Sequence, residues 1–194
     1  NYIEDNNYNH LRDIVALTIS TLSKPKLRVL DYGSNTSAWA NISNKIKMEN
    51  VEITVFDPFC KDDYSKDLDF GFKISIVNKI SELKNNKFDL TIFGSSSQYI
   101  KDFFGNILNN ESILSNSILF THTPLSLEKE FVSSQKTAWE GEKIIRDYFE
   151  LLNQLKDKGY QIIFKSNIPN QENSMDKRYF KRAVSANILF KKLN

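Results

Sequence analysis

Acidic residues follow two short apolar stretches in the first third of the chain, and they are the first candidates for chemistry. Asp31 ends the stretch 27–31, and Asp57 follows the stretch 51–56. A carboxylate at the end of a strand can accept hydrogen bonds from both hydroxyls of a ribose. Hydrogen bonds to a charged acceptor contribute about 1.5–3 kcal/mol each. We therefore expect Asp57, with Pro58 beside it, to hold a ribose. The alternative is that Asp57 only ends a strand before a proline.

The turn after Asp31 discriminates between nucleotide-like ligands, because it contains a single glycine. NAD and FAD bring a pyrophosphate to such a turn and favour the pattern G-x-G-x-x-G, and a neighbouring carboxylate would repel it. S-adenosylmethionine has no phosphate and carries a sulfonium and an ammonium group. We therefore expect Asp31, Tyr32, Gly33 and Ser34 to bind S-adenosylmethionine. Taken alone, the same residues are also compatible with an ordinary turn at a strand end.

Polar and small residues after two later apolar stretches extend this candidate cofactor site. Asn78 could bind the edge of an adenine, or it could be a simple turn residue. Gly94, Ser95 and Ser96 would face the methionine part of the cofactor and the acceptor, although serine-rich turns are common. We expect these residues to share one edge of the sheet, because the carboxyl ends of parallel strands meet there.

Two residues are candidates for catalysis on the acceptor side. His122 ends the fifth apolar stretch and could take a proton from an acceptor hydroxyl or amine, whereas a lone histidine is more often structural. Tyr99 could line the acceptor pocket or simply pack as an aromatic residue. Cys60 has no neighbour that would make it a nucleophile, and no histidine or cysteine cluster has the spacing of a metal site.

The elements that must position these residues alternate between strand and helix patterns. Helices are predicted over 8–23, 36–48, 99–108 and 136–158, the last with Gly159 as its C-terminal cap. Strands are predicted over 27–31, 51–56, 72–77, 88–93, 113–120, 160–165 and 183–190. This rhythm indicates βαβ units in a parallel sheet with helices on both faces. The last two strands have no helix pattern between them, so we expect an antiparallel pair at the sheet edge.

The composition is that of a single α/β domain. With 194 residues, 40% of them hydrophobic, the chain can bury one core. We expect one domain over 1–194, with an N-terminal helix in 1–25, the core in 27–165, and a loop with the last strand in 166–194. A net charge of +2 does not signal a nucleic-acid partner. The single cysteine and the absence of a long apolar run or secretory signal suggest a cytoplasmic protein without a membrane span.

Four basic residues crowd the segment before the last strand. Lys177, Arg178, Lys181 and Arg182 could hold a phosphate or a sugar nucleotide. A solvated surface is the favoured interpretation, because runs of charge usually face water.

These motifs together resemble the class I S-adenosylmethionine-dependent methyltransferases. The resemblance lies in V-L-D-Y-G at 29–33, Asp57 after the second strand, and F-D-L at 88–90, and it covers roughly 27–190. A narrower set of short motifs is similar to uncharacterised methyltransferase-like proteins associated with bacterial surface-polysaccharide loci. This set comprises S-Q-Y-I at 97–100, T-P at 123–124, F-V at 131–132 with Gln135, and K-G-Y at 158–160. The first turn departs from the family pattern, since it is poorer in glycine.

The resemblance implies a Rossmann-like, doubly wound sheet of seven strands with an antiparallel last strand. It also implies methyl transfer from S-adenosylmethionine to an oxygen or nitrogen of a small acceptor, with a sugar or sugar nucleotide as the candidate. The glycine-poor turn leaves open a non-catalytic binding or scaffold domain of the same fold. A nucleotide-dependent oxidoreductase is disfavoured by the missing glycines, and the sequence does not define the oligomeric state.

Overall fold

The computed structural model describes residues 9–22, 24–34, 37–59, 72–135, 141–168 and 182–193. Cys60, Lys177, Arg178 and Lys181 lie outside these ranges. The elements, in chain order, are α1 (Asn9–Leu22), β1 (Leu27–Tyr32), α2 (Ser37–Ser43), β2 (Val51–Phe56), β3 (Lys73–Val77), η2 (Ile80–Leu83), β4 (Leu90–Gly94), η3 (Ser97–Tyr99), η4 (Phe103–Ile107), β5 (Ser117–Ser126), β6 (Phe131–Gln135), β7 (Gly141–Asp147), α3 (Tyr148–Asp157), β8 (Tyr160–Ile168) and β9 (Ala183–Lys192).

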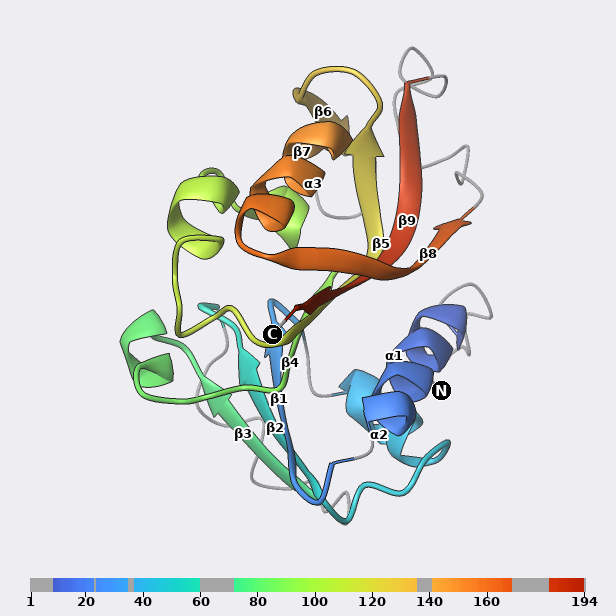
Figure 1. Cartoon of the computed structure of the whole chain (residues 1–194), viewed down its shortest axis with the longest axis vertical. Helices are drawn as coiled ribbons and strands as arrows, with labels where there is room; N and C mark the ends of the chain where they lie inside the picture. Colours follow the sequence, from blue (N-terminus) through green and yellow to red (C-terminus); the bar gives the residue numbers. More distant parts are fainter. Residues whose placement is uncertain are drawn as a thin grey trace.

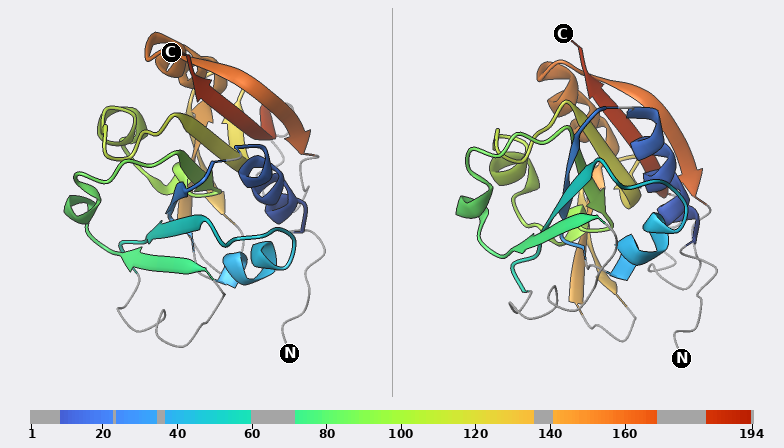
Figure 2. Two further views of the ribbon diagram at one scale, coloured as in Figure 1. Left: turned by 60° about the horizontal axis from the view of Figure 1, so that its bottom comes forward. Right: turned by 90° about the horizontal axis from the view of Figure 1, so that it is seen from below.

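The strands form one mixed sheet that is parallel through its centre. The order β3-β2-β1-β4-β5 is parallel throughout, β9 runs antiparallel to β5, and β8 runs antiparallel to β9. Figure 2 shows β8 and β9 side by side as a long ribbon at the edge. The predicted fold class and the antiparallel last pair are therefore confirmed. The sheet has nine strands instead of seven because β6 and β7 form an additional hairpin.

Helical segments lie on both sides of the central strands (Figure 1). The buried residues between them form two hydrophobic clusters. On one face, Val15 and Ile19 of α1 and Trp39 of α2 pack against β1 and β2. On the other face, the core contains Phe103 of η4 and Leu151 of α3, together with η2. All of β4 except its last residue is buried, as expected of a central strand apolar on both faces.

The predicted helix over 136–158 is wrong in its first half. Within the described residues, Gly141–Asp147 is strand β7, which pairs with β6, and the helix begins only at Tyr148. The Asp147 carboxylate accepts hydrogen bonds from the N–H groups of Phe149 and Glu150 at 2.8 and 3.1 Å, which makes it an N-cap. The isoleucines of β7 happen to continue the helical spacing of α3, so periodicity alone joined the two elements.

The ends of the helical elements also differ in part from prediction. Gly159, with φ +84°, closes α3 as predicted, and its N–H donates to the Lys156 carbonyl at 2.9 Å. The α-helix expected over 99–108 is replaced by the 3-10 turn η3 and the short π-helix η4. The helix expected over 36–48 ends at Ser43. Asp102 caps η4 by accepting from the Gly105 N–H at 2.9 Å, which starts a new turn there.

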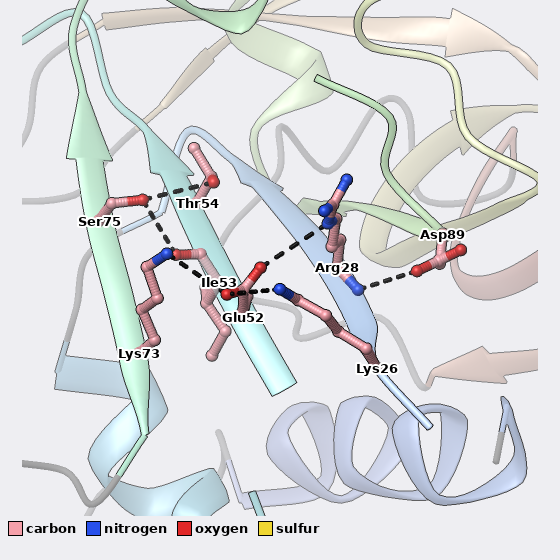
Figure 3. Close-up of polar contacts among 8 residues, drawn as sticks. All are labelled: Lys26, Arg28, Glu52, Ile53, Thr54, Lys73, Ser75 and Asp89. Atoms are coloured by element: carbon pink, nitrogen blue, oxygen red, sulfur yellow. Dashed lines mark hydrogen bonds and ion pairs between the residues drawn. The ribbon is translucent and has the colours of Figure 1, made fainter. Parts of the chain in front are cut away.

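A polar cluster lies toward the amino-terminal ends of β1, β2 and β3 (Figure 3). The Glu52 carboxylate is 3.1 Å from Lys26 Nζ, 3.7 Å from Arg28 Nε and 3.3 Å from Lys73 Nζ. The hydrogen bond from Lys26 is the main cause that holds the pKa of the Glu52 carboxyl below its usual value. These residues ion-pair across three adjacent strands at the edge opposite the candidate site. No helix of the described residues is long and apolar enough to cross a membrane.

Candidate functional site

The turns after β1, β2 and β4 are held together at the carboxyl edge of the sheet. The Gly33 N–H donates to the Phe56 carbonyl at 2.7 Å, and the Asp57 N–H donates to the Val77 carbonyl at 3.1 Å. The Ser95 N–H donates to the Thr121 carbonyl at 3.0 Å. The sheet order reverses between β1 and β4, and ligands of open α/β sheets bind outside the strand ends at such a reversal.

Gly33 and Ser96 bring the ends of β1 and β4 into close contact. Gly33 has φ +76°, and a Cβ built on it would lie only 2.6 Å from the Cβ of Ser96. The Ser96 hydroxyl donates to the Tyr32 carbonyl at 2.5 Å. Glycine is therefore required here both by its backbone conformation and by the approach of Ser96. The single glycine of this turn thus lies at the contact between the ends of β1 and β4.

Asp31 is buried beneath this turn, with an exposed fraction of 4%. Its carboxylate accepts a hydrogen bond from Trp39 Nε1 of α2 at 2.7 Å. Burial raises the pKa of the Asp31 carboxyl to about 6, against the opposing effect of hydrogen bonds with Trp39 and Ser34. A carboxylate can accept about four hydrogen bonds, so these two leave acceptor capacity for a further donor. The Asp31 side chain is thus both a partner of α2 and an acid at the strand end.

Asp57 begins the next turn and is partly exposed. Its Oδ1 accepts from the Phe59 N–H at 2.9 Å, which forms a turn around the exposed Pro58. This bond uses one carboxylate oxygen and leaves Oδ2 for other donors. Asn78 lies just beyond the end of β3 and is also partly exposed, so three adjacent strands each end in a polar side chain at this edge.

Of two other predicted site residues, Tyr32 has its side chain in the core and Gly94 lies at the end of β4. The Tyr32 side chain lies in the core, where its ring centroid is 4.7 Å from that of Phe56 and 5.5 Å from that of Phe93. At the carboxyl edge of the sheet, therefore, only the main chain of Tyr32 could contact a ligand. Gly94 ends β4, and a Cβ there would meet Thr121 Oγ1 at an ordinary 3.6 Å. The structure therefore requires glycine at position 33 but not at position 94.

His122 lies in a bulge of β5. Phe120 pairs with Ile188 and Thr123 with Ala186, so Thr121 and His122 together oppose the single residue Asn187. His122 has φ +51°, and its N–H donates to Asn187 Oδ1 at 3.0 Å.

Tyr99, the other predicted catalytic residue, lies in η3 and is 52% exposed.

No family model matches the sequence, and no curated protein matches it significantly in sequence. Solved structures do match. The Burkholderia thailandensis 1,6-didemethyltoxoflavin-N1-methyltransferase, with bound 1,6-didemethyltoxoflavin and S-adenosylhomocysteine, has a TM-score of 0.66 at 9% identity, over 98% of this chain and 80% of that chain. The N-terminal domain of EvdMO1, in the presence of S-adenosylhomocysteine and D-fucose, has a TM-score of 0.63 at 8% identity, over 100% of this chain and 85% of that chain. The [4+2]-cyclase SpnF has a TM-score of 0.60 at 14% identity, over 94% of this chain and 80% of that chain.

The chain has the fold of the S-adenosylmethionine-dependent methyltransferases. Identities this low show the fold and not the reaction, as a cyclase with the same fold illustrates.

Three buried residues contact the candidate site or the segment beside it, and the sequence analysis did not predict these contacts. Trp39 and Asn187 hold Asp31 and His122, respectively, and both are buried. Arg146 of β7 is also buried, and it donates to the carbonyl oxygens of Ser97 at 3.3 Å and of Ile100. Arg146 thereby ties the hairpin to the segment after β4. The signal in the sequence was weak, since each is a single polar or aromatic residue within an apolar pattern.

Proposed function

We propose that this protein is a methyltransferase that uses S-adenosylmethionine. The observation that carries the proposal is the pair of carboxyl groups, Asp31 and Asp57, at the ends of the adjacent strands β1 and β2. They flank a turn with one glycine in a sheet of the methyltransferase fold. Acidic groups suit hydroxyls and cations, and they oppose the phosphates of NAD or FAD.

The residues present fit the chemical groups of this cofactor. Asp57 offers its free Oδ2 to the ribose hydroxyls, and Asn78, after the neighbouring strand, offers an amide to the adenine. Asp31, Ser34 and the Gly33 turn receive the methionine end, where the Asp31 charge attracts a cation. Gly94, Ser95 and Ser96 border the methionine part and the acceptor. Tyr32 contributes through its main chain, and Pro58 shapes the ribose turn.

The protein's main catalytic task is to position an acceptor. When bound, the cofactor supplies a methyl group already activated by its sulfonium. Holding an acceptor oxygen or nitrogen in line with that group can lower the barrier by roughly 7–11 kcal/mol. The segment after β4, with Tyr99, and the β5 bulge, with His122, form the acceptor side of this arrangement.

We propose a small acceptor, with a sugar or sugar nucleotide of surface-polysaccharide synthesis as the candidate. One structural neighbour was crystallised in the presence of D-fucose and another with a small heterocyclic acceptor, so the fold accommodates ligands of this size. Arg182, the one described member of the basic cluster, pairs with Glu128 at 3.3 Å and is 59% exposed, which favours a solvated surface there.

A non-catalytic binding domain is the second candidate. It is favoured by the Asp31–Trp39 hydrogen bond, which gives the buried acid a structural partner without any ligand. In that case the protein would bind the adenosyl ligand, or none, without methyl transfer.

Calorimetric titration with S-adenosylmethionine, S-adenosylhomocysteine and NAD tests the proposal. We expect both adenosyl ligands to bind and NAD not to bind. The absence of heat from both adenosyl ligands would refute the enzyme proposal, and binding of NAD would favour an oxidoreductase. Binding without methylation across a panel of sugars, sugar nucleotides and small amines would favour the second candidate.

Two variants of Asp57 separate its charge from its turn-forming role. Asp57→Asn keeps an oxygen that can accept from the Phe59 N–H but removes the charge. We expect Asp57→Asn and Asp57→Ala each to weaken adenosyl-ligand binding at least about tenfold, the loss expected for one hydrogen bond to a charged acceptor. Only Asp57→Ala should also loosen the turn. Wild-type affinity in both variants would remove Asp57 from the site.

A further inference from the structure

The main chain of His122 is held from both sides by side chains of neighbouring segments. A bulge normally leaves its extra residue without a ladder partner. Here the His122 N–H donates to Asn187 Oδ1 of β9 at 3.0 Å, in place of a main-chain carbonyl. The His122 carbonyl accepts from the Ser95 hydroxyl at 3.2 Å. The bulged residue is therefore fixed at its donor and at its acceptor.

Asn187 is itself anchored. It is 3% exposed, and its Nδ2 donates to the Ser166 hydroxyl of β8 at 3.1 Å. This second bond orients the amide so that Oδ1 faces the bulge. A partly buried chain of hydrogen bonds thus runs from β8 through β9 to His122, across the antiparallel part of the sheet.

Two of these residues adopt a backbone conformation that non-glycine residues rarely take. His122 has φ +51° and Ser95 has φ +54°, and the two are joined by a hydrogen bond. Such conformations cost of order 1–3 kcal/mol each and persist where the surroundings over-determine them, typically at functional sites. Both lie at the carboxyl ends of the neighbouring strands β4 and β5, beside the turn with Gly33.

We propose that Asn187 and Ser95 are positioning residues that present His122 to the acceptor as its proton acceptor. This inference rests on the proposed methyl transfer and adds the acceptor class, which is a hydroxyl or ammonium group whose proton must leave. The acceptor's proton passes to the His122 imidazole and then to solvent, before attack for an ammonium and as the new bond forms for a hydroxyl. The lone pair of the acceptor atom bonds to the methyl carbon, and the electron pair of the methyl–sulfur bond stays on sulfur. An acceptor that is already a free nucleophile would not need this arrangement.

Histidine NMR tests the positioning without knowledge of the acceptor. The chain has two histidines, so with ¹³C-labelled histidine His10 provides an internal control. S-adenosylmethionine carries a sulfonium charge that S-adenosylhomocysteine lacks, and a nearby cation disfavours the imidazolium. We expect the titration midpoint of His122 to be lower with the first ligand than with the second by about half a pH unit or more. His10 should show no such difference.

The side chains that hold the main chain of His122 in place, Asn187 and Ser95 together with Ser166 behind Asn187, are called the clamp below. Variants of the clamp should reduce the difference in the His122 midpoint. We expect Asn187→Ala to reduce it to less than half of its wild-type value and to speed exchange of the His122 amide hydrogen. Asn187→Asp, which keeps an acceptor oxygen, should retain more of the difference. Ser166→Ala is the milder variant should Asn187→Ala fail to fold, and it should give an intermediate loss. Asn109→Ala, an exposed site on the opposite edge, is the matched control and should have no effect.

Two outcomes would overturn the inference. Equal His122 midpoints with the two ligands would place His122 away from the reacting methyl group. A wild-type difference that persists in both Asn187→Ala and Ser166→Ala would show that the clamp does not position the imidazole. Absence of binding by either ligand to the wild-type protein would instead refute the proposed function, so the two failures are distinguishable.

Discussion

Asp31 has one observed structural role and one proposed functional role. It is hydrogen-bonded to Trp39, which fixes α2 against β1, and it lies at the strand end where the cofactor cation is proposed. Its pKa is raised to about 6 from an ordinary value of 3.8 by burial. Natural sites often retain such destabilising groups because function requires them.

The raised pKa predicts how Asp31 affects stability. Below about pH 4 the carboxyl is protonated in both the folded and the unfolded state. Between about pH 4 and 6 the unfolded chain loses the proton while the folded chain keeps it, so stability falls as pH rises. Above pH 6 the full cost, about 3 kcal/mol for this shift, is present.

We therefore expect Asp31→Asn, whose side-chain oxygen can still accept from Trp39, to be more stable than wild type by about 3 kcal/mol at pH 7.5. At pH 4 the two proteins should differ little. Urea unfolding at several pH values measures both. A difference independent of pH would contradict the raised pKa. The same variant should bind S-adenosylmethionine more weakly, since the charge that attracts the cation is lost.

Gly33 gives a second prediction at this scale. Gly33→Ala adds a Cβ that would lie 2.6 Å from Ser96 Cβ at φ +76°. We expect a loss of about 2 kcal/mol or more in the free energy of unfolding, from backbone strain and overpacking. Thermal and urea unfolding measure it. Gly94→Ala is the matched control, because its Cβ meets only an ordinary contact at 3.6 Å. Equal effects of the two substitutions would contradict the close approach of β1 and β4.

At the scale of elements, the β6–β7 hairpin is joined to the site through Arg146. The guanidinium is 3% exposed, 2.8 Å from the Glu130 carboxylate, and lies over the rings of Phe103 and Phe104 at 5.4 and 5.7 Å. It also donates to two carbonyls of the segment after β4. The hairpin therefore stabilises the acceptor side of the proposed site through one cation.

We expect Arg146→Met to lower the free energy of unfolding by about 2–3 kcal/mol, because two carbonyl oxygens lose a charged donor. Arg182→Met is the matched control, since that side chain is 59% exposed and its ion pair with Glu128 is at the surface. Its effect should stay within about 1 kcal/mol. Chemical denaturation measures both variants. Similar losses in the two would mean that the buried contacts of Arg146 add no more stability than a surface ion pair.

At the scale of the whole molecule, the carboxyl ends of the five parallel strands β1 to β5 share one edge of the sheet. A ligand bound at that edge should stabilise the entire sheet. At a concentration of 100 times Kd, a ligand adds about 2.7 kcal/mol, which for this chain length corresponds to a rise in Tm of about 5–10 °C.

We expect S-adenosylmethionine to produce this rise at pH 7.5 and a smaller rise at pH 5 at the same ligand concentration. At pH 5 Asp31 is protonated, given its pKa of about 6, and it must lose its proton to attract the cation. Differential scanning calorimetry at the two pH values measures the shifts. A rise that is equal at both pH values would mean that the Asp31 charge does not take part in binding. Asp31→Asn is the control and should show a small rise at both.

The sequence by itself determined seven of the nine strands and the polar residues at the ends of the first three. Short apolar runs and turn residues are local patterns. The parallel core, the final antiparallel pair, and the acids at the end of β1 and just after β2 were therefore predictable. The same local reading joined β7 to α3 as a single helix. Nothing within 136–158 indicates that its first half pairs with a strand, because pairing depends on a partner elsewhere in the chain.

Only the tertiary structure decided which side chains hold the site residues in place. Asn187 is 65 residues from His122 in sequence, and Arg146 is 46 residues from Ile100, so no local pattern links either pair. Trp39 is only eight residues from Asp31, but the sequence pattern indicates an ordinary apolar helix residue. Only the structure shows that its Nε1 donates to the Asp31 carboxylate. Polar contacts in a core depend on single atoms brought together by folding, whereas hydrophobic periodicity depends only on residue type and spacing.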